Sequence, residues 1–228
     1  MNNFIKIKNI NKKYEKNKTI KVLNDISFIF ESGKIYSIVG PSGSGKSTLL
    51  NLLSLIDTPS SGSVEINKNK INFNNKIQND LLRANNIGII YQDKNLLADF
   101  SAIENVYLPN LLISNSKKIS INSAKKIIKN VGLSSRLNHF PSELSGGESQ
   151  RIAIARALIN DPEIILADEP TGSLDFENAK QIFEILFKLK NKNRIIIFAT
   201  HNRYFANMAD CKIEMIGGKM KITNERFN

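Results

Sequence analysis

The order of hydrophobic and polar positions predicts an antiparallel lobe at the start of the chain. Residues 4–10 and 19–30 alternate mostly with period two and are rich in Ile, Val and Phe, a pattern typical of half-buried strands. A polar turn at residues 15–18 separates them. A further short strand is expected at residues 63–66, whereas residues 67–79 carry no pattern that supports a prediction.

A second set of apolar runs indicates an α/β core. Residues 164–167 and 195–199 are continuously apolar, as strands buried on both faces of a parallel sheet are. Shorter runs at 35–39 and 87–91 also predict strands, and residues 47–55 are apolar at helical spacing. A crossover helix is predicted by apolar residues that share one helical face: Ile182, Phe183, Ile185, Leu186 and Leu189. The alternation of strands and helices favours the α/β class.

Residues from about 95 to 160 are expected to form a helical lobe inserted in this core. Ser101 with Glu104, and Ser145 with Glu148, are capping-box signals that predict two helix starts, the second helix running to about Leu158. Residues 119–131 have the pattern of an amphipathic helix between them. We find no internal repeat and no long linker, so residues 1–228 are expected to form a single domain.

Composition excludes several classes of protein. With 41% hydrophobic and 23% charged residues, the 228-residue chain is expected to fold as a packed domain. No apolar run approaches the roughly 18 residues of a membrane span, and the first ten residues lack the apolar block of a signal peptide, so a cytoplasmic location is expected. One cysteine and two histidines exclude an internal disulfide and a Cys/His zinc site; Cys211 is interpreted as a small buried hydrophobe.

The net charge of +11 raises the question of a polyanionic partner. The lysines are spread through Asn-rich and Ile-rich segments without a dense patch or interleaved aromatic residues, which favours a solvated basic surface over a nucleic-acid face. No nucleic-acid partner is therefore expected. The same charge would favour a position next to an anionic membrane surface.

A phosphate-binding loop is the first candidate for chemistry. It follows a predicted strand and precedes a predicted helix, and it consists of Gly40, Pro41, Ser42, Gly43, Ser44, Gly45, Lys46 and Ser47. Its glycines let backbone N–H groups point inward around phosphate oxygens, and the helix N-terminus adds its positive end. Lys46 is expected to contact the β and γ phosphates and Ser47 to bind Mg²⁺. The alternative is a flexible Gly/Ser loop before a helix.

Two carboxylates follow the buried strand at 164–167. Asp168 and Glu169, like the phosphate loop and His201, come directly after apolar strands, so all are expected at one edge of the sheet, where ligands bind. Asp168 is predicted to hold Mg²⁺ and Glu169 to act as general base on the water that attacks the γ-phosphate. The alternative is a solvated Asp-Glu turn before Pro170.

The capped helix start at residues 144–151 is a second possible anion site, because its first backbone N–H groups are exposed. One capped helix is ordinary. In a chain that already has a phosphate loop, it suggests that two copies face each other and that each completes the nucleotide site of the other.

Taken together, these segments resemble the ATP-binding subunits of ATP-binding-cassette (ABC) transporters, over essentially the whole chain. Residues 40–47 resemble that family's Walker A motif, 144–150 its signature, 164–169 its Walker B motif and 173–175 its D-loop. Gln92 resembles its Q-loop glutamine, His201 its switch histidine and Tyr14 its adenine-stacking aromatic residue. The resemblance departs from the commonest pattern at Ser149, Ser173 and Asn202, none of which replaces a catalytic group.

The resemblance implies a phosphate-loop ATPase core with a mainly parallel sheet, an antiparallel β lobe and an inserted helical lobe. It implies ATP and Mg²⁺ as ligands, and a head-to-tail dimer that encloses two ATP molecules. The implied catalytic residues are Glu169, His201 and Gln92. The implied metal-binding residues are Ser47, Gln92 and Asp168. The implied nucleotide-binding residues are Tyr14, Gly40, Pro41, Ser42, Gly43, Ser44, Gly45, Lys46, Ser47, Thr48, Ser145, Gly146, Gly147 and Asp175.

Within the family, residues 91–109 are similar to the lipoprotein-releasing group and its macrolide-export relatives. This similarity implies an integral membrane partner subunit and a peripheral position on the cytoplasmic face of the inner membrane. The alternatives are a cell-division ATPase that regulates a membrane partner without transport, the ATPase of another exporter, and a soluble cassette that acts on nucleic acid or ribosomes. The last class generally carries two cassettes per chain, whereas this chain has one. The sequence does not indicate the transported substrate.

Overall fold

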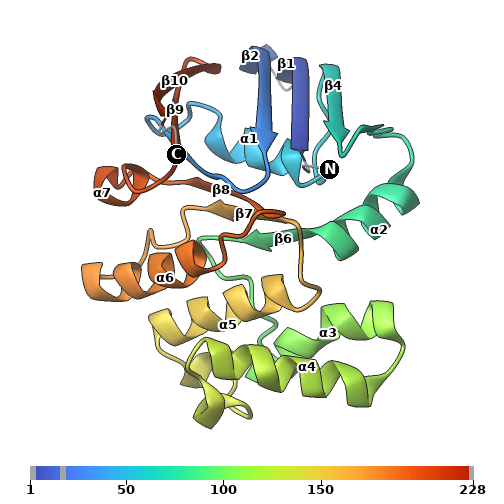
Figure 1. Cartoon of the computed structure of the whole chain (residues 1–228), viewed down its shortest axis with the longest axis vertical. Helices are drawn as coiled ribbons and strands as arrows, with labels where there is room; N and C mark the ends of the chain where they lie inside the picture. Colours follow the sequence, from blue (N-terminus) through green and yellow to red (C-terminus); the bar gives the residue numbers. More distant parts are fainter. Residues whose placement is uncertain (1–3, 16–18, 226–228) are drawn as a thin grey trace.

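Two sheets of different kinds form the upper and middle parts of the structure (Figure 1). The computed structural model describes residues 4–15 and 19–225. One sheet has six strands in the order β10-β9-β3-β8-β7-β6, and the other has four in the order β2-β1-β4-β5. The strands of the six-stranded sheet are β3 (Ile35–Val39), β6 (Ile87–Ile90), β7 (Ile164–Asp168), β8 (Ile195–Ala199), β9 (Cys211–Ile216) and β10 (Lys219–Glu225). Those of the four-stranded sheet are β1 (Phe4–Glu15), β2 (Thr19–Glu31), β4 (Ser61–Ile66) and β5 (Asn69–Lys70).

The six-stranded sheet is parallel except for β10, which pairs antiparallel with β9. Both of its faces are covered. Along β8, Ile195 and Ile197 pack into one core cluster, and Ile196 and Phe198 pack into the cluster on the opposite face. This double burial is why strands β7 and β8 read as continuous apolar runs, and it confirms the predicted α/β core.

The four-stranded sheet is antiparallel, as predicted for its first two strands. β1 pairs with β2 on one side and with β4 on the other. Ile5, Ile7 and Ile10 of β1 are buried, so one face of this sheet covers the core. Both β1 and β2 extend beyond the predicted ranges, and residues 16–18 of the predicted turn lie outside the described part of the chain.

Helix α1 (Lys46–Leu53) lies between the two sheets. Leu49 and Leu53 are fully buried, in the same cluster as residues of β1, β2, β3 and β8. Burial of a leucine side chain contributes about 2 kcal/mol to folding. The helix that follows the phosphate loop is therefore fixed firmly against both sheets.

The lower part of the structure is helical (Figure 1). A third core cluster joins α3 (Ala102–Ser114), α4 (Lys117–Asn130) and α5 (Gly146–Leu158), with two short 3-10 helices at Ser134–Arg136 and Pro141–Glu143 between α4 and α5. Both predicted capping boxes are present, at the starts of α3 and α5. Helix α6 (Phe176–Lys188) covers the other face of the parallel sheet, with Ile182, Phe183 and Leu186 buried as predicted.

Two helices lie where the sequence pattern predicts none: α2 (Lys76–Asn86) and α7 (Arg203–Ala206). The apolar residues Ile77 and Leu81 of α2 are exposed, and the buried residue is Asn79, whose side-chain amide donates to the carbonyl oxygen of Asn72 at 3.0 Å. Ile77, Leu81 and Ala84 lie at helical spacing and do form an apolar stripe, but this stripe is exposed, and the interpretation that residues 67–79 carry no pattern missed the helix.

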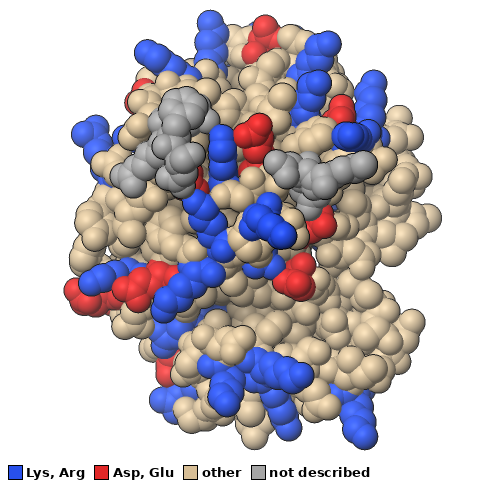
Figure 2. Space-filling view, in the orientation of Figure 1, with Lys and Arg blue, Asp and Glu red and all other residues tan. Residues whose placement is uncertain are grey.

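Basic side chains are spread over both parts of the molecule on the face shown in Figure 2. Helix α4 contributes five lysines and no acidic residue. Among the described residues, no helix is both long enough and apolar enough to cross a membrane. Cys211 is 1% exposed, which confirms its interpretation as a buried residue.

Candidate nucleotide-binding site

The phosphate loop joins β3 to α1 and depends on glycine at specific positions. Gly40 has φ +153°, and a Cβ atom there would lie 2.2 Å from the carbonyl oxygen of Met215. Gly45 precedes α1 with φ +100°, and a Cβ atom there would lie 2.8 Å from the side chain of Leu23. Only glycine can adopt this backbone conformation and lie so close to β9, as Gly40 does, or to β2, as Gly45 does.

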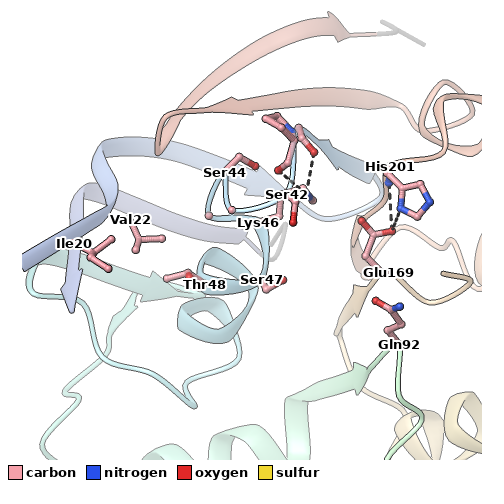
Figure 3. A pocket seen from close by; sticks show the side chains of 14 residues that line it. Ile20, Val22, Ser42, Ser44, Lys46, Ser47, Thr48, Gln92, Glu169 and His201 are labelled. Carbon is pink, nitrogen blue, oxygen red and sulfur yellow. Dashed lines mark hydrogen bonds and ion pairs between the residues drawn. The ribbon is translucent and has the colours of Figure 1, made fainter. Parts of the chain in front are cut away.

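Lys46 and Ser44 supply polar groups inside the loop. The ammonium group of Lys46 donates to the carbonyl oxygens of Gly40 at 2.9 Å and Pro41 at 3.2 Å, so the side chain folds back over its own loop (Figure 3). The Ser44 hydroxyl is buried without a partner among the described residues. A cation and an unsatisfied hydroxyl in one concave loop suit a ligand with several phosphate oxygens.

A cavity of about 730 Å³ brings the loop together with β2 and with groups that follow three parallel strands (Figure 3). Gln92 follows β6, Glu169 follows β7 and His201 follows β8, so each segment comes from the carboxyl end of a parallel strand. The convergence expected at this edge of the sheet is therefore present. The lining residues are Ile20, Val22, Gly40, Pro41, Ser42, Gly43, Ser44, Gly45, Lys46, Ser47, Thr48, Gln92, Glu169 and His201.

Glu169 and His201 contact each other on one side of this cavity (Figure 3). Nδ1 of His201 lies 2.9 Å from Oε2 of Glu169, and the backbone N–H of His201 donates to the same oxygen at 3.3 Å. Glu169 has φ +46°, a conformation that costs a non-glycine residue of order 1–3 kcal/mol and persists where the surroundings enforce it. Its side chain is 16% exposed, whereas that of His201 is 71% exposed. The histidine therefore shields and orients a mostly buried carboxylate.

Asp168 is not among the residues that line the cavity, although its neighbour Glu169 is. Its Oδ1 atom is buried and has no hydrogen-bond partner among the described residues. A buried carboxylate oxygen left unpaired is costly and indicates a missing donor, water or cation. Mg²⁺ takes oxygen ligands and is commonly held by one or two carboxylates together with substrate phosphates, so the residues present fit this ion.

Gln92 lies at the rim of the cavity. Its amide packs over Gly172, where a Cβ atom would lie 2.9 Å from Nε2 of Gln92. The side chain of Gln92 is exposed and points from the end of β6 toward Glu169 in Figure 3. A glycine at 172 therefore makes room for the Gln92 side chain beside the cavity.

Helix α5 holds the chain on either side of Gln92. The Gln150 side-chain amide donates to the carbonyl oxygen of Tyr91 at 3.2 Å. The Arg156 guanidinium donates to the carbonyl oxygens of Lys94 at 2.6 Å and Asn95 at 2.7 Å, and burial lowers the pKa of Arg156. The segment around Gln92 is thus fastened to the helix that begins at Ser145.

Four of the residues predicted to bind nucleotide do not line this cavity in their own chain: Ser145, Gly146, Gly147 and Asp175. Ser145 precedes α5, and its hydroxyl accepts from the backbone N–H of Glu148 at 3.2 Å. Asp175 precedes α6 and accepts from the backbone N–H of Asn178 at 3.0 Å, which lowers its pKa. Both side chains act as helix caps and are exposed.

Tyr14 also lies outside the phosphate cavity. It lines a neighbouring hollow of about 710 Å³, and its hydroxyl donates to Oδ2 of Asp57 at 2.7 Å. Ile20 and Val22 of β2, which no motif indicates, line the phosphate cavity instead. The pairing with β1 shifts register at Val22, so strand alternation provided no sequence signal for these two residues.

Two of the three departures from the family pattern have side-chain hydrogen bonds, and the third is buried. The hydroxyl of Ser173 accepts from the ammonium group of Lys94 at 2.9 Å. The side chain of Asn202 accepts from the backbone N–H of Tyr204 at 2.9 Å and so caps α7. Ser149 is buried in α5.

The chain is similar to characterised proteins over almost its whole length. Its sequence matches the family described as ABC transporter over residues 23–172. The lipoprotein-releasing system ATP-binding protein LolD of Rickettsia bellii is 42% identical, over 97% of this chain and 99% of that protein. LolD of Wigglesworthia glossinidia brevipalpis is 45% identical, over 96% of this chain and 98% of that protein.

The fold is similar to that of a solved ATP-binding cassette, MJ0796. A dimeric post-hydrolysis structure of MJ0796 bound to ADP and Pi superposes with a TM-score of 0.91 at 35% identity, over 98% of this chain and all of that one. A second dimeric structure of MJ0796 gives 0.90 at 36% identity. With the sequence match, these similarities show that the chain belongs to the ABC transporter family, as an ATP-binding ATPase subunit homologous to LolD.

Proposed function

We propose that this ATPase couples ATP-driven dimer closure to a separate membrane subunit that releases lipoproteins from the inner membrane. The observation that carries the proposal is that residues 40–48, Gln92, Glu169 and His201 line one and the same cavity. The LolD relatives, aligned over nearly the whole chain, support the assignment of the transported class. In this proposal, residues 1–228 act as one domain with a helical lobe at about 95–160, peripheral on the cytoplasmic face of the membrane.

The phosphate loop would hold the triphosphate and Tyr14 the adenine base. The backbone N–H groups of the loop, with the exception of Pro41, which has none, would surround the phosphate oxygens, and the Lys46 ammonium group would move from its own carbonyl partners to the β and γ phosphates. Ser47, Gln92 and Asp168 would hold Mg²⁺, which neutralises charge on the phosphates when it is bound. The unpaired Oδ1 atom of Asp168 supports this ligand set.

Glu169 would act as the general base. Its Oε2 atom is engaged by His201, and both of those contacts leave Oε1 to accept a proton from a water molecule in the cavity. The water oxygen then bonds to the γ-phosphorus as the bond to the ADP oxygen breaks. His201 keeps the carboxylate in place during this step, which is why a mostly exposed histidine matters to a mostly buried glutamate.

Ser145, Gly146, Gly147 and Asp175 would act on the second copy of the chain. They lie outside their own cavity, and Ser145 exposes the N-terminus of α5, which favours anions. Two chains arranged head to tail would place this helix start over the partner's γ-phosphate. Closure would move α5, and the bonds from Gln150 and Arg156 would pass that motion to the segment around Gln92 and on to the membrane subunit.

Copurification with the membrane partner tests this function. The tagged chain, solubilised from its native membrane in mild detergent, is expected to carry a membrane subunit that releases lipoprotein from proteoliposomes when ATP is added. The Glu169→Gln variant of the same complex is expected to retain the partner and to release nothing. Copurification with a cell-division protein, or release that is independent of ATP, would contradict the proposal.

A further inference from the structure

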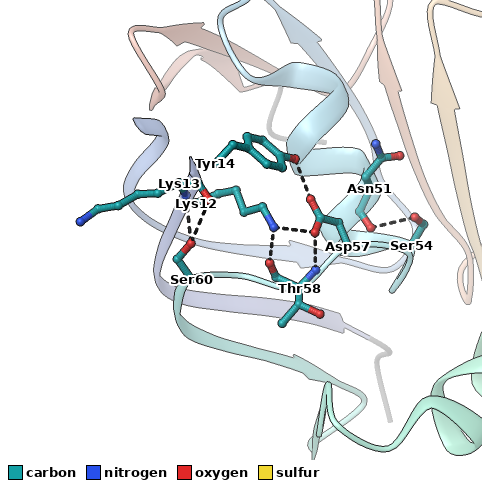
Figure 4. Close-up of polar contacts among 8 residues, drawn as sticks. All are labelled: Lys12, Lys13, Tyr14, Asn51, Ser54, Asp57, Thr58 and Ser60. Carbon is teal, nitrogen blue, oxygen red and sulfur yellow. Dashed lines mark hydrogen bonds and ion pairs between the residues drawn. The ribbon is translucent and has the colours of Figure 1, made fainter. Parts of the chain in front are cut away.

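Tyr14 is held by two charged residues from different parts of the chain (Figure 4). Its hydroxyl donates to Oδ2 of Asp57 at 2.7 Å. The ammonium group of Lys12 donates to Oδ1 of Asp57 at 2.5 Å and lies 4.7 Å from the centre of the Tyr14 ring. Lys12, Asp57 and Tyr14 thus form one connected group, the Tyr14 cluster.

The Tyr14 cluster is anchored to the helix that starts at the phosphate loop. The backbone N–H groups of Ile56 and Asp57 both donate at 3.1 Å to the carbonyl oxygen of Asn51, which lies in α1. The ammonium group of Lys12 also donates to the carbonyl oxygen of Thr58 at 2.7 Å. Helix α1 therefore presents the phosphate-binding Lys46 at one end and the support of Tyr14 just beyond the other. The loop that carries Asp57 is fastened at Asn51, five residues along α1 from Lys46, which is a rise of roughly 7.5 Å.

Burial and charge keep the Tyr14 cluster in a single protonation state. The Lys12 side chain is 10% exposed and that of Asp57 is 24% exposed. Burial alone would raise the pKa of Asp57, but hydrogen bonds from Lys12, Tyr14 and the Thr58 backbone, with the Lys12 charge, lower it. Asp57 is therefore ionised at neutral pH. Burial, and then the hydrogen bond to Asp57, raise the pKa of Tyr14, which stays a proton donor.

The cluster leaves one face of the Tyr14 ring for a ligand. Lys12 and Tyr14 are two residues apart on β1 and so project to the same face of the strand. The Lys12 ammonium group covers one side of the ring, while the tyrosine as a whole remains 39% exposed. A ring fixed at its hydroxyl and covered on one side loses little further freedom when a flat base stacks on the other side.

We propose that Lys12 and Asp57 are positioning residues that hold the Tyr14 ring at a set distance from the phosphate loop for stacking on the nucleobase. This inference rests on the proposed role of Tyr14 in binding adenine. Neither Lys12 nor Asp57 touches the nucleotide; both act through Tyr14. The ion pair between Lys12 and Asp57 could instead serve only to join β1 to the loop after α1. In that case its loss would lower the stability of the fold and would not change how much the base contributes to ADP binding.

Calorimetric titration with two ligands separates these roles. ADP carries the base, whereas inorganic tripolyphosphate binds only at the phosphate loop. We expect Asp57→Asn and Lys12→Met to raise the Kd of ADP about fivefold, part of what loss of a base–aromatic stack costs, and to change the Kd of tripolyphosphate less than about twofold. Tyr14→Phe, which removes only the hydroxyl, is expected to weaken ADP binding in the same direction and keeps the Lys12–Asp57 ion pair.

A matched control and a double variant make the outcome decisive. Asp161→Asn breaks an ion pair with Arg194, far along the chain, and is expected to change neither Kd. Asp57→Asn added to Tyr14→Ala is expected to raise the Kd of ADP no further than Tyr14→Ala alone. Thermal unfolding of every variant shows whether it is folded. If Asp57→Asn or Lys12→Met does not fold, Tyr14→Phe still tests the positioning role.

The possible failures are distinguishable. If Tyr14→Ala leaves ADP binding unchanged, the proposed role of Tyr14 is wrong. If Tyr14→Ala weakens ADP binding while Asp57→Asn, Lys12→Met and Tyr14→Phe do not, only the positioning role is overturned. Equal weakening of ADP and tripolyphosphate by Asp57→Asn, or full additivity in the double variant, also overturns it.

Discussion

At the scale of single residues, the site combines groups that the sequence indicates with groups that only packing brings near. Lys46, Ser47, Asp168 and Glu169 belong to strand-end segments and could be predicted, because parallel strands deliver such segments to one edge. Lys12 and Asp57 could not, since they are 45 residues apart and meet only where the loop after α1 returns to β1.

Replacement of Glu169 by Gln tests the general base. The amide keeps the shape of the side chain but does not accept the proton of the attacking water, so ATP turnover is expected to fall by about 10² to 10⁴ fold. ATP binding is expected to persist. Phosphate release measures turnover, and calorimetry measures binding. As a control, Glu163→Gln alters a glutamate at the other end of the same strand, where it accepts from Asn67, and should leave turnover intact. Normal hydrolysis by Glu169→Gln would show that another group is the base.

The absence of tryptophan from the chain allows a direct test of Tyr14. Tyr14→Trp introduces a single indole on β1. If the ring stacks on adenine, ADP is expected to quench its fluorescence strongly and tripolyphosphate to change it little. Tyr204→Trp, at an exposed tyrosine of α7, is the matched control and should respond to neither ligand. Equal responses to ADP and tripolyphosphate at position 14 would argue against stacking.

At the scale of secondary structure, the helix starts were predictable and the polar helix α2 was not. Capping boxes at Ser101 and Ser145 are local signals, and each is followed by a helix. Helix α2 has an apolar stripe that includes Ile77 and Leu81, but this stripe is exposed while Asn79 is buried, so the stripe does not mark the packed face of the helix. Its position depends on Leu82, which packs against the core, and on Arg83, which donates to the carbonyl oxygen of Leu55 at 3.2 Å; a local pattern records neither contact.

The start of α5 is expected to contribute stability that depends on pH. The Arg136 hydrogen bond, followed by that from the Ser145 backbone, lowers the pKa of Glu148 to about 2. Because the pKa of Glu148 is lower in the folded state, its ionised form stabilises the fold at pH values above 4.5, its ordinary pKa. This stabilisation is lost as the pH falls toward 2. Glu148→Gln is thus expected to cost about 1 kcal/mol at neutral pH.

Urea unfolding at several pH values measures this difference. The gap between the native chain and Glu148→Gln should narrow steadily as the pH is lowered below about 5. Arg136→Met removes the other partner of the 2.8 Å ion pair and should show the same trend. A gap that stays constant with pH would mean that the charge of Glu148 contributes nothing to the stability of α5.

The phosphate loop is expected to tolerate a methyl group at Gly43 far better than at Gly40. A Cβ atom at Gly40 would press against the Met215 carbonyl oxygen at 2.2 Å, whereas at Gly43 it would meet nothing within 4 Å. Gly43→Ala should therefore cost only the strain of its left-handed backbone, about 1 kcal/mol. Gly40→Ala must also displace β9 and should cost clearly more. Chemical denaturation compares the two, and equal losses would contradict this account.

At the scale of the whole molecule, a head-to-tail dimer would place the two capping-box serines, Ser101 and Ser145, in different surroundings. Ser101 is 8% exposed inside the helical part of the chain, whereas Ser145 is exposed at the surface and lies outside the cavity of its own chain. Ser145→Ala removes a helix cap worth about 1 kcal/mol, and Ser101→Ala removes the 2.6 Å hydrogen bond from the Ser101 hydroxyl to Glu104, which is worth about as much. If Ser145 completes the partner's site, only Ser145→Ala removes a ligand of the γ-phosphate as well.

Paired alanine variants therefore test the dimer. Both Ser101→Ala and Ser145→Ala should lower the free energy of unfolding slightly and leave ADP binding by the monomer intact. Only Ser145→Ala is expected to reduce ATP turnover, by about tenfold or more, because it removes a group that stabilises charge on the transferred phosphoryl. In the Glu169→Gln background, light scattering should show that it also weakens the dimer formed with ATP. If both serines alter turnover equally, or if Ser145→Ala impairs ADP binding by the isolated monomer, Ser145 acts within its own chain and the shared site does not exist.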